Sequence, residues 1–320
     1  MSAEQAGLTL GRVLRSFIPG VSWSQTKRLV AARRVSVNGR LCLDDARRMT
    51  ASDEIAVCDQ PLPAPPMDPK VAVRHLDDEV VVIQKPSGMM SVRHVAEIDW
   101  PAGKRRLQPS ADEVVLRRIS QIQPESGDLS SLPAPLRRKH LRAVHRLDRD
   151  TSGLLVFART VEAEQNLVRQ FTAHSITRTY VAVVHGVPAE GTIRNRLVRD
   201  RGDGLRGSTM APEDGKPAAT HIRPLEALGE YTLVECQLES GRTHQIRIHL
   251  AEQGQPVCGD HVYRGPVNGP VLNDGSNAPR LALHARVLEF DHPQTGERVS
   301  FESDLPADLT EFVDRLRADR

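Results

Sequence analysis

The first part of the chain places apolar residues at helical spacing and then changes to alternation. Residues 8–17 (LTLGRVLRSF) carry leucine, valine and phenylalanine on one side of an expected helix. A second helix is expected in WSQTKRLVAARR, with Ser22 as its N-cap. The following residues, RVSVNGRL, alternate around Asn38-Gly39, a dipeptide typical of a two-residue hairpin turn. Two helices followed by a hairpin predict a small α+β module.

From residue 71 onward, short apolar strands and amphipathic helices are mixed without a repeating βαβ unit. The expected strands are 79–85, 153–159, 179–186, 231–240 and 281–290. Helices are expected after Ser110, whose spacing to Glu113 matches a capping box, and over 161–174. Loops are expected at 92–109, 121–139 and 266–279. The pattern predicts an α+β fold built on a mixed, mainly antiparallel sheet.

A proline-rich stretch separates these two parts. Residues 59–70 (DQPLPAPPMDPK) have no apolar period, and such a composition is typical of an extended, semi-rigid tether. The expected organisation is therefore a small α+β domain at 1–60, a linker at 61–70 and a larger domain at 71–320.

Composition narrows the class of protein. A chain of 320 residues with 39% hydrophobic and 26% charged residues is typical of a globular protein of one or two domains. Its apolar runs are too short to span a bilayer and its first residues do not resemble a secretory signal. Its four cysteines include no C-x-x-C pair, which argues against a zinc knuckle or a disulfide framework. We therefore expect a cytoplasmic protein with reduced thiols and no membrane partner.

Charge is informative through its distribution. The formal net charge is only +2, but 37 of the 43 basic residues are arginine, which favours bidentate contacts with phosphates and carboxylates. Aromatic residues make up 3% of the chain, too few for an RNA-binding sheet that stacks several exposed rings. The N-terminal module gathers basic residues on one surface, although an isolated run of this kind is more often a solvated helix face. These residues are Lys27, Arg28, Arg33, Arg34 and Arg40.

A carboxylate among cations stands at the start of one expected strand. The segment AVHRLDRDTSG places Asp148 between Arg146 and Arg149. Loops at strand ends commonly carry functional groups, because a rigid scaffold presents them. Opposite charges keep a carboxyl group ionised, and such a group can act as a nucleophile or as an electrostatic stabiliser. A structural ion pair explains the same pattern, so the local sequence leaves both interpretations open.

Two further segments hold unusual side chains. ITRTYVAVVHG places Tyr180 in an aliphatic strand, where a core tyrosine is the simplest interpretation. SGRTHQIRIHL gathers Arg242, His244, Gln245, Arg247 and His249 within eight residues. Thr243 is the expected N-cap of a helix that runs to about residue 253. The two histidines are five residues apart and do not share a helix face, so no metal site is predicted.

Several segments follow one another in a recognisable order. They are KPSGMM (85–90), HRLDRDTSGLLVFART (145–160), RTYVAVVHG (178–186), GKPAATHIRPLE (215–226), SGRTHQIRIHLAEQGQPVCGD (240–260) and LALHARVLEFDHPQTGE (281–297). This series resembles the successive motifs of RluA-type pseudouridine synthases. Residues 8–57 resemble the RNA-binding domain shared with ribosomal protein S-four. Together the two resemblances cover nearly the whole chain.

The resemblance implies an isomerase that converts uridine to pseudouridine in RNA and needs neither a metal nor a cofactor. It implies that Asp148 is the catalytic residue, that Tyr180 stacks on the target base and that Arg247 pairs with Asp148. Arg146 would fill the gap left by the extruded base. The residues expected to contact RNA are Arg146, Arg149, Arg242, His244, Gln245, Lys27, Arg28, Arg33, Arg34 and Arg40.

The expected partner is RNA, with ribosomal RNA ahead of transfer RNA, and the expected state is a monomer. A non-catalytic RNA-binding or ribosome-assembly protein is the main competing function. A hydrolase would need a second carboxylic acid, and Asp150 is better explained as structural. The chain also departs from the family: Arg178 and Ser240 stand where lysine and threonine are common, and the stretch between Gly88 and His145 is long.

Overall fold

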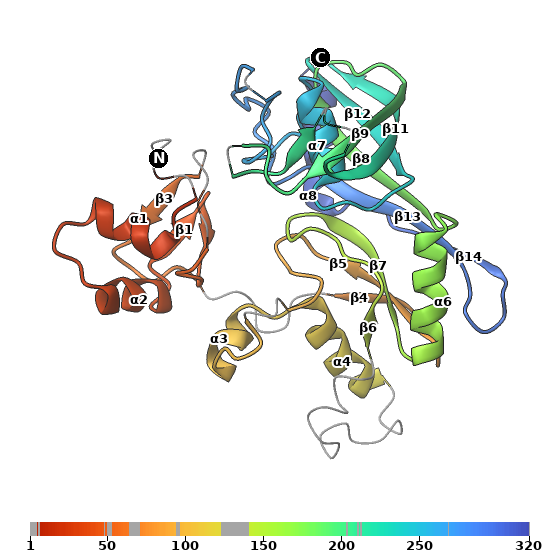
Figure 1. The fold of residues 1–320 in the computed structure, drawn as a ribbon, viewed down its shortest axis with the longest axis horizontal. Helices are drawn as coiled ribbons and strands as arrows, with labels where there is room; N and C mark the ends of the chain where they lie inside the picture. Colours follow the sequence, from red (N-terminus) through yellow and green to blue (C-terminus); the bar gives the residue numbers. More distant parts are fainter. Residues whose placement is uncertain are drawn as a thin grey trace.

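The computed structural model contains two sheets that have no strand in common among the described residues (Figure 1). The described residues are 5, 7–47, 49, 53–63, 71–93, 97–122, 141–202, 204–209, 211, 213–267 and 269–319. The smaller sheet belongs to the N-terminal part of the chain, at the left of Figure 1, and the larger one to the residues from 71 onward. No helix in the described part of the chain is long and apolar enough to cross a membrane.

The N-terminal part folds as its pattern predicts. Its elements are α1 (Leu10–Phe17), α2 (Trp23–Ala31), β1 (Val35–Val37), β2 (Arg40–Leu41) and β3 (Ile55–Val57). Ser22 caps α2 through a capping box with Gln25. Asn38 and Gly39 join β1 to β2 with φ values of 53° and 70°, the two positive values that a type I′ hairpin turn requires. The two helices and the hairpin are confirmed.

The larger sheet has 11 strands in the order β10-β9-β11-β12-β8-β13-β7-β5-β4, with β14 on β13 and β6 on β7. The strands are β4 (Ala72–Leu76), β5 (Val80–Lys85), β6 (Arg142–Ala143), β7 (Ser152–Ala158), β8 (Thr177–His185), β9 (Gly191–Val198), β10 (Gly207–Thr209), β11 (Lys216–Leu228), β12 (Tyr231–Leu238), β13 (Leu283–Asp291) and β14 (Arg298–Glu302). Of these pairings only β13 with β7 is parallel. The mixed, mainly antiparallel sheet is therefore confirmed.

The centre of this sheet positions the loop that precedes β7. Every residue of β7 is buried, because helices and neighbouring strands cover both faces. Gly153 lies where β7 meets β13, with φ at 120°, and a Cβ atom there would stand 2.2 Å from the carbonyl oxygen of Ala285. Only glycine tolerates that approach. The strand start, and with it the preceding loop, is fixed against β13.

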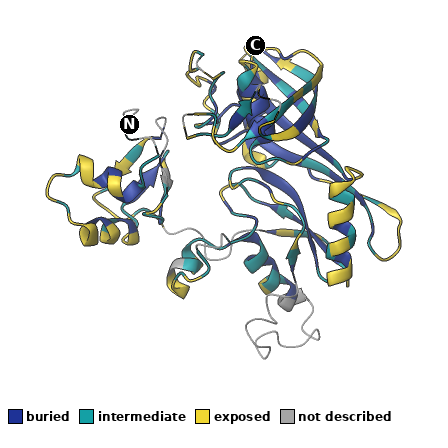
Figure 2. Ribbon diagram, in the orientation of Figure 1, coloured by how far each residue is buried: buried dark blue, intermediate teal, exposed yellow. Residues whose placement is uncertain are grey.

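The helices of the larger part are α3 (Ala102–Leu107), α4 (Ala111–Ile122), α6 (Val161–Thr172), α7 (Gln245–Glu252) and α8 (Ala307–Ala318). Helix α6 packs buried Ala163 and Leu167 toward the sheet and exposes its outer side (Figure 2). Helix α7 is different, because residues 245–251 are all buried. A helix that is covered on all sides can present functional groups to an internal pocket.

Two local expectations are wrong. The loop expected at 92–109 contains α3, which begins after Pro101 and whose last carbonyls accept hydrogen bonds from the Arg93 guanidinium. Helix α7 begins at Gln245, so its N-cap is His244 instead of Thr243. The Gln245 side chain accepts a hydrogen bond from the backbone N–H of Arg242 at 3.0 Å, and this closes the turn one residue later than expected. Most of the loop expected at 121–139 lies outside the described residues.

Candidate active site

The loop before β7 is anchored first through His145. Its Nε2 accepts a hydrogen bond from the backbone N–H of Val156 at 3.1 Å. Its ring stacks on Phe171 of α6, with the centroids 4.8 Å apart. Burial, with a smaller contribution from Arg178, lowers the pKa of His145 to about 3. The imidazole is therefore neutral at pH 7 and serves as a fixed acceptor.

Ser91 and Lys85 anchor the rest of this loop. The Ser91 hydroxyl donates to the carbonyl of Leu147 and accepts from its N–H, both at 2.9 Å. The Lys85 ammonium is fully buried and donates to three carbonyl oxygens, among them that of Arg149 at 3.1 Å. Burial lowers the pKa of Lys85 to about 7. With residues 145, 147 and 149 held, the Asp148 side chain projects from a rigid loop.

Asp148 projects into a pocket of about 590 Å³. Two donors face its carboxylate: Nη1 of Arg247 lies 3.8 Å from Oδ2, and Nε2 of His244 lies 3.8 Å from Oδ1. The Arg247 contact is an ion pair, and both separations exceed hydrogen-bond distance. Within the described residues the Asp148 carboxylate accepts no hydrogen bond. Its oxygens are thus electrostatically held and still available to a substrate.

Arg247 is held mainly by a residue that the sequence did not single out. Its guanidinium makes two hydrogen bonds to Asp260, at 2.6 and 2.7 Å, and both side chains are buried. Asp260 also accepts the backbone N–H groups of Val262 and Tyr263. Burial alone would raise the pKa of Asp260, but the Arg247 guanidinium and these hydrogen bonds outweigh it and keep the pKa below its usual range. The expected pair of Arg247 with Asp148 exists as the longer contact, and the Gly-Asp at the end of PVCGD was the available signal for Asp260.

His244 reaches Asp148 because its backbone is left-handed, with φ at 60°. Its Nδ1 lies 2.8 Å from the hydroxyl of buried Tyr263. If Tyr263 donates to Nδ1, Nε2 carries the proton and faces the Asp148 carboxylate, which is the favourable arrangement. Burial lowers the pKa of His244 to about 4, so the ring is neutral at pH 7. Tyr263 was not identified from the sequence.

The opposite wall of the pocket is formed by β8. Tyr180 and Arg178 are two residues apart on this strand, so their side chains leave the same face, and both line the pocket. Both are buried. Burial raises the pKa of the Tyr180 phenol, which is therefore neutral at pH 7, and lowers the pKa of Arg178.

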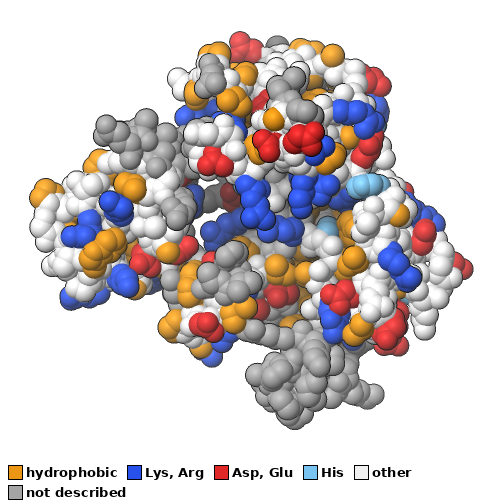
Figure 3. All heavy atoms as spheres, viewed as in Figure 1, with side chains coloured by type: hydrophobic (Ala, Val, Ile, Leu, Met, Phe, Trp, Pro, Cys, Tyr) orange, Lys and Arg blue, Asp and Glu red, His pale blue; other side chains and the backbone are white. Residues whose placement is uncertain are grey.

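Several expected RNA-contacting residues lie around this pocket. Arg146 is exposed and Arg242 half-buried at its lining, and Figure 3 shows Lys and Arg side chains gathered in the central hollow of the molecule. Gln245 is buried, and its amide bonds Ser240, Ala219 and Thr220 inside the protein. We therefore infer that Gln245 holds the start of α7 in place and does not contact RNA, contrary to expectation.

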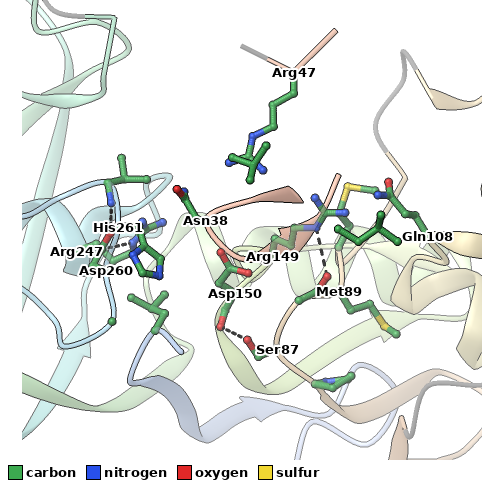
Figure 4. A pocket seen from close by; sticks show the side chains of 18 of the residues that line it. Asn38, Arg47, Ser87, Met89, Gln108, Arg149, Asp150, Arg247, Asp260 and His261 are labelled. Carbon is green, nitrogen blue, oxygen red and sulfur yellow. Dashed lines mark hydrogen bonds and ion pairs between the residues drawn. The ribbon is translucent and has the colours of Figure 1, made fainter. Parts of the chain in front are cut away.

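Arg149 lies elsewhere. It lines a second cavity of about 390 Å³, on the side of Arg247 away from Asp148 (Figure 4). Residues of the β1–β2 hairpin also line this cavity. In this cavity the Arg149 Nε donates to the carbonyl of Gly88. The neighbouring carbonyl of Asp150 accepts a hydrogen bond from the Ser87 hydroxyl at 2.7 Å. The structure thus separates Arg149 and Asp150 from the Asp148 pocket.

The basic residues of the N-terminal part are only partly free for a ligand. Lys27 and Arg28 are exposed on α2, and Arg33 is half-buried. Arg34 donates to the carbonyl of Cys58 at 2.7 Å and so helps to close its own module. The side chain of Arg40 lies outside the described residues.

Two side-chain clusters outside the pocket have the composition of metal sites: His75, Asp77 and His292, and His185, Cys258 and Asp274. In each of them a histidine already contacts the carboxylate, His292 at 3.0 Å and His185 at 3.1 Å. Histidine–carboxylate pairing accounts for both clusters. All four cysteines are free thiols.

Comparison with known proteins now identifies the family. Residues 79–252 match the family model described as RNA pseudouridylate synthase. The Bacillus subtilis (strain 168) protein named Uncharacterized RNA pseudouridine synthase YlyB is 36% identical over 99% of this chain and 96% of its own length. Ribosomal large subunit pseudouridine synthase D of Neisseria meningitidis serogroup B is 34% identical, over 98% of this chain and 80% of its own. The chain belongs to the RNA pseudouridine synthase family.

The RluA-type resemblance is therefore confirmed, and so is the prediction of an isomerase, because enzymes of this family convert uridine to pseudouridine in RNA. Among solved structures, Human RNA Pseudouridylate Synthase Domain Containing 4 superimposes with a TM-score of 0.58. It is 22% identical in sequence and covers 77% of this chain and 93% of its own. That likeness confirms the fold.

Proposed function

We propose that this pseudouridine synthase acts on the RNA of the large ribosomal subunit, with Asp148 as its catalytic carboxylate. The observation that carries the proposal is the setting of Asp148, which projects from a rigid loop between two donors and opposite Tyr180. The choice of RNA follows the printed name of the relatives that are ribosomal large subunit synthases.

Binding begins with extrusion of the target uridine, because a stacked base cannot reach Asp148. Extrusion costs a few kcal/mol, and contacts with the flanking phosphates offset it. Arg146 and Arg242 at the pocket lining are suited to this, as are exposed Lys27 and Arg28 on α2. Arg146 fills the space left in the RNA.

The chemistry is an internal exchange of bonds. The bond between N1 of uracil and C1′ of ribose breaks, its electron pair stays with the base, and the Asp148 carboxylate meets the electron-poor C1′. The base turns, C5 bonds to C1′, the C5 proton is lost and N1 gains a proton. Arg247, fixed by Asp260, holds the Asp148 carboxylate in place. Neutral Tyr180 stacks on the base, and its hydroxyl can relay the proton that leaves C5, accepting it as it gives up its own.

Tritium release from C5-labelled uridine tests this proposal. Unmodified transcripts of large-subunit ribosomal RNA and of transfer RNA are offered separately to the wild type and to Asp148→Asn. We expect release only by the wild type and only from ribosomal RNA, with a loss of about 10⁴-fold or more in the variant and unchanged RNA binding. Asp150→Asn, whose side chain borders the other cavity, is the matched control and should keep wild-type release.

Each other outcome has a definite meaning. Equal release by Asp148→Asn would remove Asp148 from the chemistry, and release from transfer RNA alone would change the substrate. Tight binding without release by the wild type would favour a non-catalytic RNA-binding protein. The division at residues 60 and 70, an S-four-like RNA-binding role for the first part, the monomeric state and the cytoplasmic location stay predictions.

A further inference from the structure

Arg178 is a buried cation that has no counter-ion in the described part of the chain. Only 7% of its surface is exposed. Its Nη2 makes one long hydrogen bond, 3.4 Å, to the carbonyl oxygen of Glu239, and its buried Nε has no partner. Among the described residues no carboxylate forms an ion pair with Arg178. Buried charges are normally paired and fully hydrogen-bonded, since leaving them otherwise is costly.

The groups around Arg178 are neutral or cationic. Its guanidinium carbon lies 5.3 Å from the centre of the Phe171 ring, and the nearby His145 is uncharged at pH 7 because its pKa is about 3. On a third side a Cβ atom added at Gly241 would stand 2.4 Å from Nη1. Space for the cation thus depends on this glycine. Among the described residues no group in this setting offsets the charge.

The cation faces the pocket of Asp148. Arg178 lines it beside Tyr180, on the same face of β8. Of the described residues that line the pocket, Asp148 alone carries a carboxylate. Asp148 is already faced by Arg247 and His244 on the other wall. An anion that neutralises Arg178 must therefore come with the substrate.

Two anions accompany an RNA substrate. The backbone phosphates belong to the RNA chain outside the pocket, where exposed Arg146 is available. The extruded base enters more deeply, and it becomes an anion only when the bond to C1′ breaks. The electron pair of that bond stays with uracil and is shared between N1 and the ring carbonyl oxygens. A buried arginine beside the base-stacking tyrosine matches the second anion better.

We propose that Arg178 is a catalytic residue that donates hydrogen bonds to a carbonyl oxygen of the uracil anion formed during turnover. The proposal rests on the proposed function of the pocket and assigns its leaving-group site. A preorganised donor aimed at developing charge in a dry site is typically worth a factor of 10²–10³ in rate. In this arrangement the cost of burying Arg178 without a partner is recovered in the transition state.

The first test separates this role from a structural one. Arg178→Met removes the charge but keeps an apolar side chain of similar length. Because no ion pair is lost, we expect its thermal midpoint to equal or exceed that of the wild type, while the single-turnover rate falls about 100-fold or more. Arg178→Lys, which keeps the charge but not the planar fork, should recover part of the rate. A markedly lower midpoint in both variants, with rates falling in proportion to unfolded protein, would overturn the proposal.

The second test asks which anion Arg178 binds. Transcripts of large-subunit ribosomal RNA are made with uridine or with 5-fluorouridine, whose electron-withdrawing fluorine stabilises the detached base as an anion. Because C5 of 5-fluorouridine has no proton to lose, the reaction is followed on both RNAs as loss of the N1-linked nucleoside, by chromatography with mass spectrometry under single-turnover conditions. The defect of Arg178→Met should shrink about tenfold or more on fluorinated RNA, because a better leaving group needs less help. Arg242→Gln at the pocket lining is the phosphate control.

The outcomes remain distinguishable. A defect of Arg178→Met that is equal on both RNAs, with weaker binding and a salt slope reduced by about one, would show that Arg178 binds a phosphate and overturn the proposal. Arg242→Gln should behave in that way. Failure of the wild type on uridine transcripts would refute the proposed function itself, whereas a normal wild type with an unaffected Arg178→Met would refute only the role of Arg178.

Discussion

The two walls of the Asp148 pocket each bury an arginine, and they treat its charge in opposite ways. On the α7 wall, Arg247 is bound through two hydrogen bonds by buried Asp260. On the β8 wall, Arg178 makes one long hydrogen bond to a carbonyl oxygen and pairs with no carboxylate among the residues that the structure describes. The first arrangement fixes a position, and the second keeps a charge available.

The difference follows from what each side chain has to do. Arg247 approaches the Asp148 carboxylate at 3.8 Å, and an unpaired arginine there would move toward Asp148 and occupy its oxygens. Asp260 holds the guanidinium back, so the oxygens of the Asp148 carboxylate remain free. In the proposed complex with RNA, Arg178 faces a base that is neutral until the bond to C1′ breaks. A carboxylate of the protein beside Arg178 would cancel its positive field before the uracil anion forms.

Removal of the counter-ion on the α7 wall should have the largest effect. Asp260→Asn keeps the size of the side chain but leaves Arg247 buried without an anion, and we expect a loss of about 3–5 kcal/mol in the free energy of unfolding. Urea denaturation measures it. Glu302→Gln, which breaks the exposed pair with Arg286, is the matched control and should cost less than about 1 kcal/mol.

A double variant completes this comparison. Arg247→Met in the Asp260→Asn background removes the stranded cation, so most of the lost stability should return, although activity should not. If the double variant is no more stable than Asp260→Asn, the loss comes from the Asp260 contacts with the backbone N–H groups of Val262 and Tyr263.

Prediction from the sequence succeeded where the information is local. The hairpin follows from the backbone freedom of Asn38-Gly39, and β7 from an uninterrupted apolar run. The structure also brings Asp148, Tyr180 and Arg247, which the family motifs single out, to one pocket. Their catalytic roles remain proposals.

The remainder of the site depends on contacts between segments that are distant in the sequence. Asp260 stands 13 residues from Arg247, and their contact exists only because the chain turns back after α7. The alternation of β8 places Arg178 on the same face as Tyr180, but its missing counter-ion depends on Phe171 and Gly241 from other elements. No rule based on residue spacing predicts that a buried side chain lacks a counter-ion.

The β8 wall should be sensitive to the glycine that makes room for its arginine. In Gly241→Ala the new methyl group would stand 2.4 Å from Nη1 of Arg178, so the guanidinium must swing away. We expect a stability cost of about 1 kcal/mol and a tenfold or larger loss of single-turnover rate. In the Arg178→Met background the same substitution should change the rate little, because the displaced group is already gone. An equal loss in both backgrounds would mean that Gly241 acts on the backbone of the turn.

The smallest expected effect is on His145, which reports the field of Arg178. Burial is the main cause of its low pKa, about 3, and Arg178 is the second. Arg178→Met should raise this pKa and leave it well short of the ordinary 6.5, as measured by NMR titration of the imidazole. Between the folded pKa and 6.5 the unfolded chain binds a proton that the folded chain does not, so stability falls as the pH drops through this window. Raising the folded pKa narrows the window and makes the variant less acid-sensitive. His249 on α7, whose low pKa is caused by burial alone, should not move, and an unchanged His145 would mean that Arg178 does not act on the pocket wall through its charge.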